Sequence, residues 1–134
     1  HESGEIYSIE VSARKFDILY AHDGYIVHTN HYLDPQMRQI EKDPEELISS
    51  RVRYFRASRL LRQNDKHSIK SLQAIQQDHV NIPNSICNHN IAGLDPLDRE
   101  KTINALVIDL TLREMHIAWG TPCTKAFHTY HLDA

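Results

Sequence analysis

The segment TINALVIDLTL, residues 102–112, constrains the fold more than any other stretch, because it gives the strongest strand signal in the chain. Apolar residues stand at every second position from Leu106 to Leu112 and therefore share one face. The following segment REMHIAWG, residues 113–120, is predicted to return beside it as a hairpin. Residues 126–133, AFHTYHLD, predict one further strand. The C-terminal part should therefore form an antiparallel sheet.

The N-terminal part also shows strand patterns. In EIYSIEVS, residues 5–12, the side chains of Tyr7, Ile9 and Val11 should face one way, which predicts a half-buried strand. The pair Asp23-Gly24 favours a tight turn, so residues 15–31 are predicted to form a β-hairpin around it. Bulky residues on both faces of its second strand, 24–31, suggest a strand covered on both sides.

Helices are predicted between these strand regions. A first helix should run over residues 44–63 with Asp43 as its N-cap, and its apolar stripe would comprise Ile48, Val52, Phe55 and Leu60. Ser68 should cap a second helix over residues 69–77, while residues 34–44 read as a loop and 85–87 as a short strand. Antiparallel strands with two central helices grouped between them predict an α+β fold.

Composition narrows the class of protein. The 134 residues suffice for a single domain, residues 1–134. The net charge of −3 gives no basic field for nucleic acid, and no apolar run approaches the roughly 18 residues of a membrane span. No signal peptide is visible and the two cysteines form no disulfide framework, so a cytoplasmic location is expected. The chain starts at His1 rather than Met, which suggests a cut inside a larger protein.

Ten histidines raise the question of a metal site. In the predicted strand, His28 and His31 have an odd separation and would point to opposite faces, so they cannot chelate one ion together unless a bulge intervenes. A second candidate set would need loop and strand ends to converge, and no pair in it has a familiar zinc spacing. That set comprises Cys87, His89, Cys123, His128 and His131. We therefore expect no metal and no cofactor, with a histidine-based metal protein as an alternative.

Three other groups could carry chemistry. Neither Cys87 nor Cys123 opens a helix or has an obvious activating neighbour, so both read as small structural thiols rather than nucleophiles. The arginines of the first helix read as a solvated face. Asn30 offers an N–H₂ group that does not titrate, which suits an oxyanion hole, although a buried Asn that satisfies a neighbouring loop is an alternative.

Several short motifs, in order, resemble the acyl-coenzyme A:6-aminopenicillanic acid acyltransferase family, also called the penicillin acyltransferase family. They are VHTNH at 27–31, the pattern S-x-x-R-x-x-R-x-x-x-L-L at 50–61, SIC at 85–87, Arg99 with Thr102 leading into a strand, and Gly120-x-Pro122. The resemblance spans nearly the whole chain. It implies an N-terminal nucleophile hydrolase fold, in which two antiparallel sheets stack between two helical layers (αββα).

The resemblance also implies a function. Members of this family cleave themselves before a cysteine, and that cysteine transfers an acyl group from a thioester or amide to an amine or water. By motif position, Asn30 matches the family's oxyanion-stabilising asparagine, and Arg99 matches an arginine at its active site. The nucleophile should lie upstream, and His1 cannot replace it, so we expect this chain to be the C-terminal portion of a larger acyltransferase or hydrolase domain.

The expected partners follow from that interpretation. They are a small-molecule acyl donor, an amine acceptor and the missing N-terminal part of the same enzyme, with no nucleic acid and no membrane. The alternative is a non-catalytic domain or degenerate fragment that binds a partner chain through an uncovered sheet edge or face.

Overall fold

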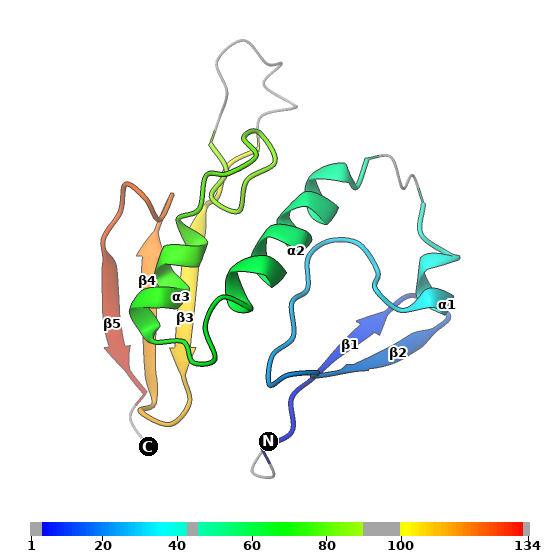
Figure 1. Ribbon diagram of the computed structural model, residues 1–134, viewed down its shortest axis with the longest axis horizontal. Coiled ribbons are helices and arrows are strands. Elements are labelled where there is room, and N and C mark those ends of the chain that lie inside the picture. The colour runs from blue at the N-terminus through cyan, green and yellow to red at the C-terminus, as the bar shows by residue number, and fades with distance from the viewer. Residues whose placement is uncertain (1–3, 43–45, 90–99, 133–134) are drawn as a thin grey trace. The chain divides into compact units, whose positions relative to one another are not determined.

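A computed structural model describes residues 4–42, 46–89 and 100–132 (Figure 1). The chain divides into two compact units, His1–Ser58 and Arg59–Ala134, with the boundary inside one helix. A two-stranded antiparallel sheet lies in the first unit, and a three-stranded antiparallel sheet lies in the second. Antiparallel sheets with few helices agree with the predicted α+β class. No helix in the described ranges is long and apolar enough to cross a bilayer.

The first unit begins with a hairpin that lies earlier in the chain than predicted. Strands β1 (Tyr7–Val11) and β2 (Phe16–Tyr20) pair antiparallel with Val11 opposite Phe16. Ser12 closes the turn: its backbone N–H donates to the Lys15 carbonyl at 2.8 Å, and its hydroxyl accepts from the Lys15 N–H at 3.0 Å. This side chain to backbone bonding is a turn signal that the alternating pattern alone does not show.

The predicted hairpin over residues 15–31 is wrong. The Asp23-Gly24 turn is present, with positive φ at both residues and an isolated bridge between His22 and Tyr25. Residues 26–31 nevertheless form no strand. Side chains from other parts of the chain accept several of the backbone N–H groups in this segment and just after it, as described below. These groups therefore do not need a partner strand.

Burial in β1 is the reverse of the predicted pattern. Glu10 is only 3% exposed, whereas Ile9 and Val11 on the other face are more than half exposed. The buried carboxylate is satisfied because it accepts the backbone N–H groups of Leu33 and Asp34, at 2.6 and 3.0 Å. A buried charge is tolerated only with such partners, so the polar face of β1 is a binding surface for the chain that follows.

The helices of this unit also depart from expectation. Residues 34–44 were predicted as loop, but Pro35–Arg38 form a short helix α1, capped by the Asp34 side chain, which accepts from the N–H groups of Gln36 and Met37. Helix α2 (Ile48–Leu61) buries serines, Ser50 and Ser58, rather than the predicted apolar stripe. Ile48 and Phe55 of that stripe are exposed. The predicted cap, Asp43 with Pro44, lies outside the described residues.

The second unit holds helix α3 (Ile69–Gln76) and strands β3 (Asn104–Asp109), β4 (Glu114–Trp119) and β5 (Phe127–His131), in the order β3-β4-β5 (Figure 1). This confirms the predicted hairpin and last strand. The predicted cap is also confirmed, since Ser68 accepts from the Ser71 N–H. Helix α3 packs against β3, and Gln76 donates to the Leu106 carbonyl at 2.7 Å.

In β3, the buried face is the one with the smaller side chains. Ala105 and Val107 of β3 and Ala118 of β4 are buried, whereas Leu106 and Ile108 on the opposite face are 38% and 49% exposed. In β3, the face that apolar alternation assigned to the core is therefore the more exposed one, whereas Ile117 of β4, which pairs with Leu106 on that face, is buried. Strand parity was predicted well, but parity cannot tell which of two apolar faces is covered.

Candidate functional site

The hydroxyl of Ser50, in the first turn of α2, organises the segment around Asn30. Ser50 Oγ accepts the backbone N–H groups of Asn30 at 2.7 Å and of His31 at 3.0 Å. It also lies 2.9 Å from Thr29 Oγ1 and 2.8 Å from His31 Nδ1. Two accepted bonds use both lone pairs of the hydroxyl, so its proton is available to Thr29 or His31. This one buried side chain therefore fixes the backbone at residues 29–31.

His31 is the buried member of this segment. Its side chain contacts the hydroxyls of Ser50 and Thr29, and its ring meets that of Tyr54 edge-on, with centroids 5.5 Å apart. Burial lowers the pKa of His31 below its ordinary value, and nearby Arg51 acts in the same direction while Glu41 opposes it. The neutral ring suits the site, because Ser50 Oγ already accepts two backbone N–H groups and has no lone pair left for the N–H of a charged Nδ1.

Asn30 is exposed, unlike the two-sided setting predicted for it. Its side-chain oxygen accepts a 2.7 Å hydrogen bond from Nη2 of Arg53, one turn along α2 from Ser50. Within the described part of the chain, no acceptor takes the N–H₂ group of Asn30. The guanidinium therefore orients the amide, because an oxygen held by a cation leaves the nitrogen to point toward another acceptor.

Glu10 holds the other end of the motif. Its Oε1 lies 2.7 Å from Nε2 of His28, and the same carboxylate accepts the N–H groups of Leu33 and Asp34. His28 and His31 thus contact different partners. Their predicted placement on opposite faces of one strand is wrong because the segment is not a strand.

The motif residues of unit 1 thus come together. VHTNH meets the S-x-x-R part of α2 through the pairs Asn30–Ser50 and Asn30–Arg53. Arg99 lies outside the described residues. Residues 85–87 form no strand, contrary to prediction: the Ser85 hydroxyl donates to the Cys87 carbonyl at 2.6 Å instead of joining a ladder.

A second polar cluster lies in the other unit. Its members are His79, Cys87, His89 and Cys123, whose ligand atoms all lie within 4.8 Å of one another. Three of them belong to the candidate set considered from the sequence, and His79 was missed because seven residues separate it from Cys87 without any zinc motif. His128 and His131 lie on β5 instead, where His131 Nδ1 is 3.5 Å from Glu114.

Neither cysteine of this cluster has the features of an activated nucleophile. Cys87 is fully buried, and burial raises the pKa of its thiol to about 11, so the thiolate is scarce at neutral pH. Cys123 is exposed, with its Sγ 3.2 Å from Nε2 of His89. That nitrogen is shared with two further side chains, so it is not dedicated to Cys123 as a base.

The chemistry that unit 1 offers is hydrogen-bond donation from a neutral amide beside a fixed cation. Such a donor stabilises negative charge that develops on a carbonyl oxygen during acyl transfer. The sequence model of the family described as acyl-coenzyme A:6-aminopenicillanic acid acyl-transferase matches residues 1–124. Among curated proteins, none matches the chain significantly.

Proposed function

Because the chain belongs to the acyl-coenzyme A:6-aminopenicillanic acid acyltransferase family, whose name indicates acyltransferase-type activity, we propose that it forms one flank of a cysteine-dependent acyl-transfer site. The enzyme moves an acyl group from a thioester or amide to an amine or to water. Asn30 supplies the oxyanion donor, and the nucleophilic cysteine comes from a part of the enzyme outside residues 1–134.

One observation carries this proposal: Arg53 orients the amide of Asn30, and none of the residues that the structure describes takes up its N–H₂ group. In the reaction, a thiolate attacks the acyl carbonyl carbon, and the carbonyl oxygen becomes an oxyanion. An amide nitrogen about 3 Å from that oxygen would stabilise the tetrahedral intermediate, because the donor is preorganised before the charge develops. Ser50 and Glu10 hold the backbone on both sides of Asn30, so the donor need not reorganise.

Arg99 is assigned a substrate role on its motif position alone. It follows Asp98 and precedes Thr102, whose backbone N–H and hydroxyl anchor Asn88 in the second unit. A guanidinium there would suit a carboxylate on the acyl donor or the acceptor, since arginine pairs with carboxylates in a bidentate way.

Exposed apolar faces on both sheets support a place for this chain within a larger αββα enzyme. In the first unit, Tyr7, Phe16 and Tyr20 are at least half exposed, and in the second unit Ile108 of β3 and Trp119 of β4 are 49% and 61% exposed. Apolar area of this extent usually marks a surface that another layer covers. We assign that layer to the N-terminal part of the same enzyme.

The test uses the full-length enzyme. Intact mass and N-terminal sequencing should show a precursor cut before a cysteine, and incubation with a series of acyl-coenzyme A thioesters should release free coenzyme A. Alkylation of the new N-terminal cysteine should abolish that release. A chain that is never cut before Cys, Ser or Thr, and that releases no thiol from any thioester, would refute the proposal.

A further inference from the structure

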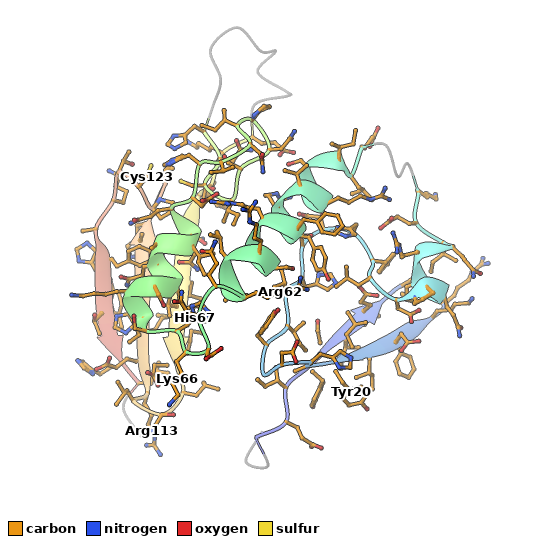
Figure 2. The ribbon with its side chains drawn as sticks, in the orientation of Figure 1. Tyr20, Arg62, Lys66, His67, Arg113 and Cys123 are labelled. Atoms are coloured by element: carbon orange, nitrogen blue, oxygen red, sulfur yellow. The ribbon has the colours of Figure 1, made fainter. Side chains whose placement is uncertain are left out.

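Four potential metal ligands gather at one end of the three-stranded sheet, in the unit that does not contain Asn30. His79, Cys87 and His89 lie on the segment after α3, and Cys123 lies in the connection from β4 to β5. Figure 2 shows Cys123 just beyond the end of β4, at the end of the sheet where that segment also lies. Residues 44 positions apart in the sequence are thus neighbours.

The distances within this cluster are close to those of a tetrahedral coordination shell. Nε2 of His89 lies 2.9 Å from Nε2 of His79, 3.2 Å from Sγ of Cys123 and 3.7 Å from Sγ of Cys87. Zinc bonds of about 2.0–2.3 Å place tetrahedral ligand atoms about 3.3–3.8 Å apart. The other three pairs of ligand atoms lie within 4.8 Å of each other. Shifts of up to about one ångström would therefore bring these four atoms to coordination distance.

Hydrogen bonds already connect the segments that carry the four ligands. The Cys87 N–H donates to the Asp78 carbonyl at 2.9 Å, which joins Cys87 to the residue beside His79. Gln77 Nε2 donates to the carbonyl of Pro122, the residue before Cys123, at 3.1 Å. A ligand site held by its own scaffold loses little entropy when an ion binds.

A third connection passes through Thr102. Its N–H donates to the Asn88 carbonyl at 3.0 Å and its hydroxyl accepts from the Asn88 N–H at 2.9 Å, so the residue between Cys87 and His89 is held twice. The Thr102 carbonyl accepts from the Thr121 hydroxyl at 3.3 Å, which ties in the Cys123 turn. Each of the four ligands is therefore at most two residues away from a hydrogen bond that joins its own segment to a segment carrying another ligand.

We propose that His79, Cys87, His89 and Cys123 bind one Zn²⁺ ion and that this site fastens the segment after α3 to the β4–β5 connection. Two thiolates with two imidazoles are a closed tetrahedral set for zinc, with no position left open for a substrate. A bound ion would also explain the contacts around His89. Nε2 of a neutral His89 cannot form hydrogen bonds to His79, Cys87 and Cys123 at once, whereas a cation accepts one lone pair from each of the four ligand atoms.

This site goes beyond acyl transfer and is independent of Asn30. It also departs from the expectation, drawn from sequence spacing, that the chain binds no metal. The spacing has no familiar pattern because the fourth ligand arrives from a distant loop. We assign the ion a structural role, since metal that binds only the folded state adds its binding free energy to stability.

The test starts with the full-length protein made without a histidine tag. Elemental analysis should find one zinc per chain. After replacement by Co²⁺, the visible spectrum should show the intense bands of tetrahedral cobalt, with a thiolate-to-cobalt charge-transfer band in the near ultraviolet. Chelation should lower Tm, and added zinc should restore it. The cobalt spectrum is recorded on the wild-type protein, so this test does not depend on whether a variant folds well.

Variants then assign the ligands. His79→Ala and Cys123→Ser replace exposed side chains and should each lower bound zinc from one per chain to near zero. His128→Ala removes an exposed histidine of β5 outside the cluster and should leave the zinc in place. Trace metal that is the same in all four proteins would overturn the proposal. So would a Cys87–Cys123 disulfide, detected as thiols that titrate only after reduction.

Discussion

Arg53 donates a 2.7 Å hydrogen bond from Nη2 to the side-chain oxygen of Asn30. The bond decides which end of the amide is available, because a guanidinium is donor only and must face the oxygen. The nitrogen of Asn30 is left as a donor that carries no charge and keeps its state at any working pH. The relationship joins the VHTNH motif to the S-x-x-R motif in space, and it supports an oxyanion role for Asn30.

The first prediction concerns Asn30 itself. Asn30→Ala in the full-length enzyme should lower kcat by about 10²–10³, the usual effect of removing one oxyanion donor. KM should change little, since the interaction strengthens only in the transition state. The residue is exposed, so Tm should stay close to that of the wild type. Steady-state kinetics with a thioester substrate measure the effect, and an unchanged kcat would reject the assignment.

The second prediction treats Arg53 as a positioning residue. Arg53→Ala should lower kcat by about tenfold, because a hydrogen bond to a charged group contributes about 1.5–3 kcal/mol and part of the orientation survives. The double variant Asn30→Ala, Arg53→Ala should be no slower than Asn30→Ala alone, since both substitutions remove one interaction. Additive losses would show that Arg53 acts elsewhere. Arg59→Ala, an exposed arginine on the same helix, is the matched control and should keep full activity.

The third prediction concerns Ser50. Ser50→Ala leaves the N–H groups of Asn30 and His31 without their acceptor, and an unsatisfied buried group costs about 1–3 kcal/mol. We expect the free energy of unfolding to fall by at least that amount in denaturant titrations. Ser58→Ala, the other buried serine of α2, is the control. If both variants lose equal stability, the loss reflects helix packing rather than the Asn30 segment.

Apart from the strand expected at 85–87, the sequence predicted the elements of the second unit well, and it predicted those of the first unit poorly. The hairpin of β3 and β4, the strand β5 and the Ser68 cap depend on local patterns, namely alternation and capping. The hairpin of the first unit was misplaced because Glu10 and Ser50, which bond to residues 28–34, lie far from that segment in sequence. Buried polar contacts between distant residues override local propensity, and periodicity does not show them.

The site was predicted in the same uneven way. Asn30 was singled out by its motif, and the structure adds the partner that orients it, Arg53, which lay in a pattern otherwise read as a solvated face. The convergence of His79 with Cys87, His89 and Cys123 has no local signal at all, since it depends on the path of the chain after α3 and after β4. Only tertiary structure brings such ligands together.

The fourth prediction concerns Arg99. If it binds a substrate carboxylate, Arg99→Ala should raise KM or abolish activity while the far-ultraviolet circular dichroism spectrum and Tm stay unchanged. Arg99→Lys should recover only part of the activity, because an ammonium cannot form the bidentate pair. A variant that fails to fold would instead mark Arg99 as structural and leave the substrate role unsupported.

The fifth prediction is a pH dependence of stability that comes from His31. Burial lowers its pKa in the folded state, so the unfolded chain binds a proton more readily. The stability that the neutral ring provides should be complete above about pH 6.5, the unfolded value, and should be lost as the pH falls through the lower folded value. Protonation would also place a second N–H donor against Ser50, whose lone pairs already accept two backbone groups. Denaturant titrations of wild type and His31→Asn from pH 7.5 to about pH 5 isolate this term. The difference between their unfolding free energies should shrink on acidification. A difference that stays constant would show that protonation of His31 does not cause the pH dependence of stability.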